Sequence, residues 1–374
     1  MSIRTFIGFL LAAWVAQMAI GAAPPPRKAA AKPAARKSSA SKKKKAPPVD
    51  PTVGDNVDGD DLLVRRAAVE SLGNLNGSVV AVNPESGRVL TIVNQKLAYQ
   101  SGFIPCSTVK LVTALAALSE GVVDRGTFIP VGRYLSMNLT SALAKSNNPY
   151  FAVLGTRLGF DKVSYYARLF GLGEKAGLDI AGEQAGSLPD APPKNGGVGM
   201  MCSFGEGIAM TPLQLAGVLT AIANGGTLYY MQYPRSQAQV QEFAPRVKRR
   251  LPIGPWLPDI KVGMRAAVDF GTARRLGNSN SEPVLGKTGT CTDFSSASHM
   301  GWFGSFNDVG RNRLAVVVML TGGRSVNGPL AAGVAGKMYH TLSEQKYFAQ
   351  AREPQPRRSD LPELLVTMPV CCSQ

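Results

Sequence analysis

The sequence predicts an α+β protein in which helices flank an antiparallel sheet and a further block of helices forms an all-helical subdomain. Three observations carry this prediction. An alternating hairpin pattern comes early in the chain, a long stretch of helical periodicity follows it, and three more alternating segments precede a final helix. The composition agrees, because 45% hydrophobic and 18% charged residues in a chain of 374 exclude a disordered or fibrous protein.

The first half of the pattern contains a helix, a hairpin and a second helix. Residues 62–72 have the apolar spacing of a helix, and residues 77–82 and 88–93 alternate like two strands around the turn NPESG. Residues 108–118 (TVKLVTALAAL) predict a strongly apolar helix, and Ser107 is well placed to cap its start.

The second half separates helices from strands. Residues 151–226 are typical of helices joined at glycine-rich turns. Residues 284–289, 300–306 and 314–320 alternate like strands, and residues 330–343 predict the closing helix. This segregation indicates an antiparallel sheet with helices packed on it.

The two ends differ from this globular part. Arg4 precedes an apolar stretch, so residues 1–23 are predicted to be an export signal; an uncleaved anchor is the alternative, since about 18 apolar residues is near the lower limit for spanning a bilayer. Residues 24–59 are expected to be a disordered basic linker rich in Ala, Pro and Lys. Residues 60–348 are then the domain, and residues 349–374 a flexible tail.

The positive charge is concentrated before the domain. The chain has 41 basic and 25 acidic residues, a net charge of +16, and ten of the basic residues lie within residues 1–49, which contain no acid. The other 31 basic residues against 25 acidic ones leave +6 for the rest. We expect the linker to be extended by self-repulsion; the alternative is a basic arm that contacts anionic lipid headgroups or cell-wall polymers. Export argues against nucleic acid as a partner.

The first chemical motif is S-x-x-K at the start of the apolar helix. Ser107 and Lys110 are three residues apart, which puts both side chains on one helical face with Cβ atoms about 5–6 Å apart. The chain has only two histidines, His299 and His340, so a lysine is the natural base for a serine nucleophile. At its ordinary pKa only about one lysine in 2,500 is neutral at pH 7, and burial or a second cation raises that fraction.

Two further motifs follow. Ser146 and Asn148 form S-x-N; in an extended loop both side chains would face one cleft, where the hydroxyl relays a proton and the amide holds a peptide bond. Lys287, Thr288 and Thr290 lie on a predicted strand, where the two hydroxyls share a face that suits a carboxylate. Each motif alone also occurs by chance, as a capping serine, a polar turn or an ordinary strand.

The order of the three motifs on helix, loop and strand resembles the penicillin-binding transpeptidase family. The resemblance extends from about residue 62 to about residue 345. Other segments resemble those of the family: residues 77–87, 146–151, 170–173, 205–216, 223–226, 271–274 and 286–290.

This resemblance implies the fold shared by penicillin-binding transpeptidases and serine β-lactamases, and acyl transfer on the D-Ala-D-Ala stem peptide of peptidoglycan. Ser107 is then expected to attack the penultimate D-alanine carbonyl, with Lys110 as general base. Ser146 is expected to pass a proton to the departing D-alanine with support from Lys287, and Asn148 to position the donor peptide.

The resemblance also implies binding roles for the K-T-G-T strand. Thr288 and Thr290 are expected to bind the terminal carboxylate, and Gly289 to leave room for an extended substrate. The backbone N–H groups of Ser107 and Thr290 would form the oxyanion hole. No metal and no organic cofactor is implied.

The expected function is therefore a D,D-transpeptidase that cross-links stem peptides and is acylated by β-lactams at Ser107. The expected partners are stem peptides, β-lactam antibiotics and other proteins of cell-wall synthesis. The expected location is the periplasm or the outer face of the bacterial cytoplasmic membrane.

Three alternatives stay open. A D,D-carboxypeptidase on the same fold would use water as acceptor, although the segment TPLQ at residues 211–214 favours a transpeptidase. A serine β-lactamase needs a feature that activates water against the acyl-enzyme, and the sequence offers no clear candidate. A non-catalytic penicillin-binding sensor or scaffold would keep the pocket without turnover.

Cysteines mark the departures from the family. The family usually has glycine before the nucleophilic serine and alanine or serine after K-T-G-T, whereas this chain has Cys106 and Cys291, with Cys202 in the middle region. Five cysteines do not make a disulfide framework at this length. Cys106 and Cys291 either pair in an oxidising envelope or stay as two small buried thiols.

Overall fold

The computed structural model describes residues 50–277, 283–293 and 298–349. The predicted export signal or anchor, residues 24–49 of the linker and the tail from residue 350 lie outside the described residues, so the expectations for them stay predictions. Among the described residues, no helix combines the length and the apolar character that crossing a membrane requires.

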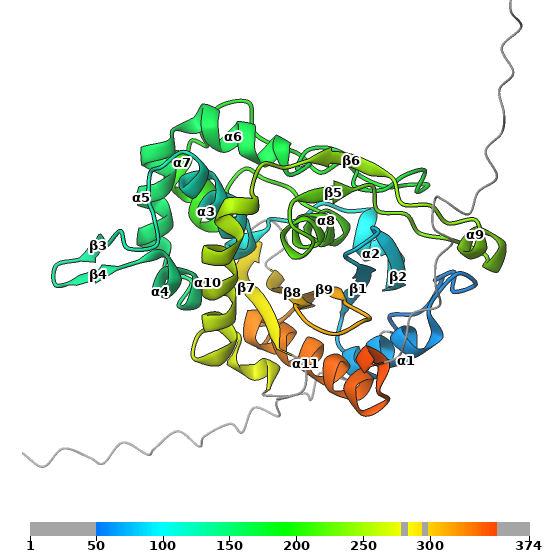
Figure 1. Ribbon diagram of the computed structural model, residues 1–374. Helices are drawn as coiled ribbons and strands as arrows, with labels where there is room; N and C mark the ends of the chain where they lie inside the picture. The colour runs from blue at the N-terminus through cyan, green and yellow to red at the C-terminus, as the bar shows by residue number, and fades with distance from the viewer. Residues whose placement is uncertain (1–49, 278–282, 294–297, 350–374) are drawn as a thin grey trace, which may run out of the picture. The chain divides into compact units, whose positions relative to one another are not determined.

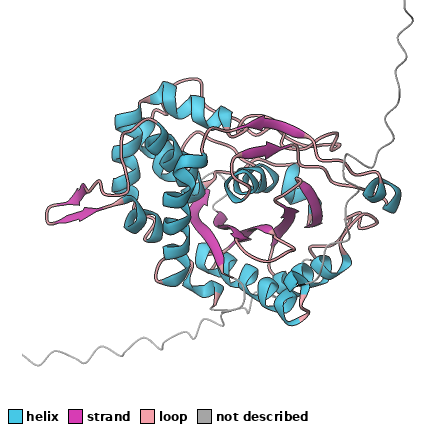
Figure 2. Ribbon diagram, in the orientation of Figure 1, coloured by secondary structure: helices cyan, strands magenta, loops and turns pink. Residues whose placement is uncertain are grey.

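A five-stranded antiparallel sheet forms the centre of the described domain, and Figures 1 and 2 show helices around its strands. The strand order is β2-β1-β9-β8-β7, so the predicted hairpin ends one edge and the K-T-G-T strand ends the other. The strands are β1 (Gly77–Asn83), β2 (Arg88–Val93), β7 (Val284–Asp293), β8 (Ser298–Asn307) and β9 (Ala315–Gly322). The expected α+β class is thereby confirmed.

Alternating side chains place an apolar core on each face of this sheet. In β9, Val316 belongs to the core shared with α1 (Leu62–Leu72) and α11 (Gly328–Glu344), whereas Val317 belongs to the core shared with α8 (Pro212–Ala223). Because helices cover both faces, the central strands are apolar along nearly their whole length.

The remaining helices form the second core with α8 or connect the layers. They are α2 (Gln95–Tyr99), α3 (Lys110–Ser119), α4 (Leu139–Ala144), α5 (Asn148–Leu158), α6 (Phe160–Leu169), α7 (Gly197–Phe204), α9 (Gln237–Gln241) and α10 (Leu257–Asp269). Short 3-10 turns are η1 (Cys106–Val109), η2 (Gly254–Trp256), η3 (Arg274–Leu276) and η4 (Tyr347–Ala349). Helices α3 to α7 supply the predicted helical subdomain.

Two small sheets were not predicted from the sequence. One pairs β3 (Ile129–Gly132) with β4 (Leu135–Met137), and Figure 1 shows this hairpin projecting from the helices beside it. The other pairs β5 (Thr227–Tyr229) with β6 (Val247–Arg250). Strands of three or four residues are too short to establish a period in the sequence.

The predicted cap of the apolar helix is wrong. Helix α3 begins at Lys110, and Ser107 lies inside η1 instead of capping the helix. The Pro105 carbonyl accepts hydrogen bonds from the N–H of Thr108 and, at 2.6 Å, from its hydroxyl, so Pro105 and Thr108 hold the start of the turn. This arrangement leaves the Ser107 hydroxyl free of a structural capping role.

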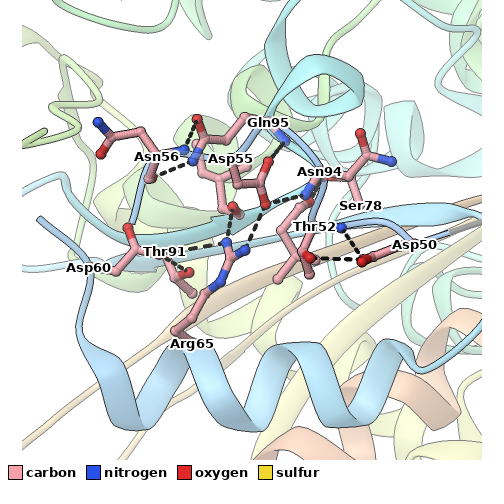
Figure 3. Close-up of polar contacts among 12 residues, drawn as sticks. Asp50, Thr52, Asp55, Asn56, Asp60, Arg65, Ser78, Thr91, Asn94 and Gln95 are labelled. Carbon is pink, nitrogen blue, oxygen red and sulfur yellow. Dashed lines mark hydrogen bonds and ion pairs between the residues drawn. The ribbon is translucent and has the colours of Figure 1, made fainter. Parts of the chain in front are cut away.

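Residues 50–59, which the sequence analysis assigns to the linker, lie against the domain. Figure 3 shows the buried carboxylate of Asp55 between Arg65 on α1 and the start of α2. It accepts hydrogen bonds from the Arg65 guanidinium at 2.8 Å and from the N–H groups of Asn94 and Gln95 at 3.0 and 2.8 Å. The Arg65 guanidinium also donates to the Ile92 carbonyl at 2.6 Å. The ion pair and the two backbone N–H groups thus tie this segment to α1 and to the end of β2.

Candidate active site

The S-x-x-K motif spans the junction of η1 and α3. Lys110 is fully buried and Ser107 is 7% exposed, and Lys110 Nζ lies 3.0 Å from Ser107 Oγ. The expected single face for both side chains is therefore present, although a 3-10 turn supplies part of it.

The S-x-N motif forms a corner and not the extended loop expected from the sequence. Ser146 has a left-handed backbone (φ 54°), and Asn148 is the first residue of α5. The corner is fixed because Asn147 caps α5 by accepting the N–H of Tyr150 at 2.8 Å, and Pro149 occupies its first turn.

This corner closes on Lys110. Lys110 Nζ donates to the Ser146 carbonyl at 2.7 Å and to Asn148 Oδ1 at 2.5 Å, and lies 3.2 Å from Ser146 Oγ. The left-handed turn at Ser146 lets both its carbonyl and its hydroxyl face the lysine, which explains why a non-glycine residue occupies a conformation that costs about 1–2 kcal/mol.

The third motif brings a second buried lysine to the same hydroxyl. Lys287 on β7 is fully buried, and its Nζ donates to Ser146 Oγ at 2.8 Å and to the Thr288 carbonyl at 2.8 Å. Ser146 Oγ therefore lies between the two lysines, and motifs from three distant parts of the chain meet at one point.

Burial changes the charge of this centre. It lowers the pKa of Lys110 from 10.5 to about 7. It also lowers the pKa of Lys287 well below 10.5, and the nearby charge of Lys110 acts in the same direction. With a pKa of about 7, about half of the Lys110 side chains are neutral at pH 7, compared with about one in 2,500 for an exposed lysine. A lysine base is thus available without histidine.

The two threonines of K-T-G-T already have partners. Thr288 Oγ1 is buried and lies 2.5 Å from Thr272 Oγ1, whereas Thr290 is exposed and its Oγ1 accepts the N–H of Gly328 at 2.7 Å. The Thr290 O–H proton is therefore not used by Gly328 and is available to a ligand.

Gly289 has a packing role that the sequence analysis did not anticipate. A Cβ at this position would lie 3.2 Å from both the Pro105 carbonyl oxygen and Thr108 Cγ2, so the glycine allows β7 to lie directly against η1. The side that lacks a side chain is therefore filled by the turn that carries Ser107 and by Trp302 on β8, whose Cβ would also lie 3.2 Å away.

A disulfide joins the same two elements. Cys106 and Cys291 are bonded, with Cα atoms 5.6 Å apart, so the first of the two alternatives for these cysteines holds in the structure. Cys106 is fully buried and has a left-handed backbone (φ 51°), while Cys291 is half-buried. The third described cysteine, Cys202, is a buried free thiol whose pKa burial raises to about 12.

Two neighbours of the site were missed as site residues. Thr272 contacts Thr288, and the Phe151 ring has its centroid 5.3 Å from Lys110 Nζ, where it excludes water from the lysine. Both lie in segments that resemble the family, residues 271–274 and 146–151, which was the available signal.

Residues 50–277, 283–293 and 298–349 contain no group of three or more His, Cys, Asp or Glu side chains that could hold a metal ion. A cavity of about 660 Å³ lies between α1, η3 and α11, lined by residues such as Leu72, Leu276 and Lys337, and no residue of the three motifs lines it.

Comparison with known proteins identifies the part of the chain that contains the three motifs. The profile of the family described as "Penicillin binding protein transpeptidase domain" matches residues 77–340. The Stage V sporulation protein D of Bacillus subtilis is 29% identical over 252 residues, which cover 56% of this chain and 39% of that protein. The peptidoglycan D,D-transpeptidase FtsI of Escherichia coli is 28% identical over 245 residues, which cover 54% of this chain and 42% of that protein. The matched part thus spans about two fifths of these relatives' length.

Solved structures show the same fold. The D,D-transpeptidase domain of a peptidoglycan glycosyltransferase from Eggerthella lenta has a TM-score of 0.63 at 20% identity, covering 76% of this chain and 82% of that chain. Pseudomonas aeruginosa PBP2, solved in complex with WCK 5153, has a TM-score of 0.65 at 24% identity, covering 77% of each chain.

Proposed function

This chain belongs to the penicillin-binding protein transpeptidase family, and on that premise we propose that it is a serine D,D-transpeptidase that cross-links peptidoglycan stem peptides through an acyl-enzyme on Ser107. The observation that carries the proposal is the buried pair of lysines around Ser146 Oγ, with Lys110 Nζ 3.0 Å from Ser107 Oγ. Relatives named as peptidoglycan D,D-transpeptidases support the reaction class.

Neutral Lys110 is oriented to act as the base. The Ser146 carbonyl and Asn148 Oδ1 can only accept hydrogen bonds, so they take both protons of the neutral amine. Its lone pair is then left for the Ser107 hydroxyl at 3.0 Å. As Ser107 Oγ bonds to the penultimate D-alanine carbonyl, its proton passes to Lys110.

Ser146 completes the proton path to the leaving group. Its Oγ lies 3.2 Å from Lys110 Nζ and accepts from Lys287 at 2.8 Å. When the C–N bond to the terminal D-alanine breaks, Ser146 gives its proton to the departing amine and receives the proton held by Lys110. Lys287 stabilises the negative charge that forms on Ser146 Oγ during this exchange.

The strand β7 would hold the substrate. The Thr290 hydroxyl, exposed and with its proton available, and the Thr288 hydroxyl would bind the terminal carboxylate. The N–H groups of Ser107 and Thr290 would stabilise the oxyanion. An amine of a second stem peptide then attacks the ester, the Ser107 oxygen leaves with a proton, and a cross-link forms.

The cellular setting is part of the same proposal. The apolar stretch within residues 1–23 supports export, which would place the domain in the periplasm or at the outer face of the cytoplasmic membrane. There the enzyme would meet stem peptides, β-lactams and other proteins of cell-wall synthesis, and the basic linker would lie close to the membrane surface.

The test is acylation by a fluorescent penicillin, followed by the intact mass of the full chain over hours. A long-lived adduct that is absent in Ser107→Ala and present in Ser101→Ala, an exposed serine six residues earlier, is the expected result. An adduct that clears within seconds would instead indicate a β-lactamase. No adduct on folded protein would indicate a sensor or scaffold.

Acceptor choice needs a second measurement. The purified protein is given a D-Ala-D-Ala stem peptide with and without a second stem that carries a free amine. A cross-linked product supports the transpeptidase, whereas release of D-alanine with only the hydrolysed peptide in both cases would identify a D,D-carboxypeptidase.

A further inference from the structure

The disulfide joins the turn that carries Ser107 to the K-T-G-T strand. Cys106 directly precedes Ser107, and Cys291 directly follows Thr290. These two neighbours carry the N–H groups assigned above to the oxyanion hole. One covalent bond therefore spans both halves of that hole.

Few other contacts fix this spacing. Among the hydrogen bonds of the described residues, none joins η1 to β7; the two elements meet by packing, at Gly289 against Pro105 and Thr108. Packing contacts alone allow η1 and β7 to shift relative to each other more easily than a covalent bond does. The disulfide joins residues that are 185 positions apart in the chain. The hydrogen bonds of Lys110 and Lys287 to Ser146 Oγ link Ser107 to β7 indirectly, and the disulfide is the direct covalent link between the two.

The backbone of Cys106 adds a second dependence. Its φ of 51° lies in the left-handed region that disfavours a residue with a side chain. The neighbouring Ser107 takes its direction from this bend. The hydrogen bonds from Thr108 to the Pro105 carbonyl enclose this bend, and the bond to Cys291 adds a covalent support that reduction removes.

We propose that the Cys106–Cys291 disulfide is a redox-sensitive positioning element that holds Ser107 and the K-T-G-T strand at the spacing required for acylation, so that reduction switches the enzyme to a slow form. This inference rests on the proposed function. The reductant is a dithiol, either a small molecule or a thioredoxin-like protein. Two electrons and two protons pass from the dithiol to the two cysteines, and the dithiol becomes a disulfide.

The exposure of the two cysteines decides which sulfur the reductant attacks first. Cys106 is fully buried and Cys291 is half-buried, so the attacking thiolate bonds to the Cys291 sulfur and the Cys106 thiolate leaves and is protonated. A second thiol of the reductant then displaces Cys291 from the mixed disulfide. The protein keeps both thiols in place for reoxidation.

The test compares acylation before and after dithiothreitol, in the full chain with Cys371→Ser and Cys372→Ser to remove the tail thiols. Rapid-quench measurements with a fluorescent penicillin give the binding constant of the reversible complex and the acylation rate constant separately. Reduction is expected to lower the acylation rate constant about ten- to a hundredfold, since a displacement of about 1 Å has effects of that size. The binding constant is expected to change less than about threefold, because Thr288 and Thr290 stay on β7.

Three variants separate positioning from general stability. Cys291→Ser should be slow with and without dithiothreitol, whereas Cys106→Gly with Cys291→Ala should recover most of the rate, because glycine adopts the left-handed bend without a bond. Cys202→Ala should stay sensitive to dithiothreitol. Alkylation of buried Cys202 in the reduced protein serves as the check on folding, and it is expected to stay slow.

The outcomes are distinct. Equal or faster acylation by reduced, folded protein with Cys106 and Cys291 both alkylated would overturn this inference alone. A double variant as slow as Cys291→Ser would also overturn it, since the bend would then not be the cause. No adduct in either redox state would overturn the proposed function and this inference with it.

Discussion

Acylation of Ser107 should rise with pH and level off just above neutrality, because Lys110 must be neutral to take the serine's proton. Burial lowers the pKa of Lys110 to about 7. The neutral fraction is then about one in eleven at pH 6, about a half at pH 7 and about ten in eleven at pH 8. The rate should therefore increase about tenfold between pH 6 and pH 8 and hardly at all above pH 8.

An unperturbed lysine would give a different curve. With a pKa of about 10.4, the neutral fraction rises tenfold for each pH unit, so the rate would increase about a hundredfold between pH 6 and pH 8 and continue to rise. The two curves differ in slope and in the presence of a plateau, and the difference does not depend on the absolute rate.

The assay is the second-order rate constant for acylation by a fluorescent penicillin from pH 5.5 to 9.5, with folding checked by circular dichroism at each pH. Lys110→Arg should lose at least about a thousandfold in rate and the plateau with it, because a guanidinium does not deprotonate in this range. Lys145→Arg, an exposed lysine beside the S-x-N motif, is the matched control and should keep the profile. A hundredfold rise without a plateau, or a flat profile, would refute the role given to Lys110.

Three other predictions concern the same scaffold. Lys110→Met should abolish acylation. A lysine whose folded-state pKa is lowered binds fewer protons than in the unfolded chain, so the thermal midpoint of the unmodified protein should fall relative to that of Lys110→Met between about pH 10 and pH 7; a constant difference between the two midpoints would contradict this. Ser146→Ala should lower the acylation rate constant, measured by rapid quench, about 10²–10⁴-fold and should change the thermal midpoint little. A loss of less than tenfold would show that Ser146 is not part of the proton path. Asp55→Asn should lower the free energy of unfolding in urea by about 2 kcal/mol, because the buried Arg65 loses its closer carboxylate and keeps only Asp60 at 3.6 Å. Asp58→Asn at an exposed position should change this free energy by less than about 0.5 kcal/mol, and equal effects would count against the anchoring role of Asp55.

Long helices and strands could be predicted from the sequence because the spacing of their apolar residues shows which face of the element is buried. The helix at residues 62–72 has the bounds Leu62–Leu72 in the structure, and the hairpin and the three later strands all belong to one sheet. The strand expected at residues 284–289 continues to Asp293, since the polar residues after Gly289 give no apolar signal although β8 pairs with them.

Features that depend on contacts between distant segments could not be predicted in the same way. Asp55 is polar and lies in a segment without periodicity, and only Arg65 and the N–H groups of Asn94 and Gln95 show why it is buried. The two cysteines left two alternatives open in the sequence, because the distance between them is a property of the packed η1 and β7. The motif residues were found by type and order, while their spacing around Ser146 Oγ came only from the fold.

The site contains two left-handed backbone residues and two buried lysines, all of which oppose folding. The two backbone bends are stabilised by different contacts. Cys106 and Ser146 both adopt left-handed backbones, which cost about 1–2 kcal/mol each. At Ser146 the bend is supported by hydrogen bonds, since Lys110 holds its carbonyl and Lys287 its hydroxyl. At Cys106 the described side-chain contact is the covalent bond to Cys291, beside a weak approach of its sulfur to the Ile104 carbonyl. Hydrogen bonds from Thr108 to the Pro105 carbonyl also enclose the bend at Cys106, so reduction removes one of its supports and none of those at Ser146. If the proposed roles hold, proton transfer and the positioning of Ser107 can therefore be perturbed separately.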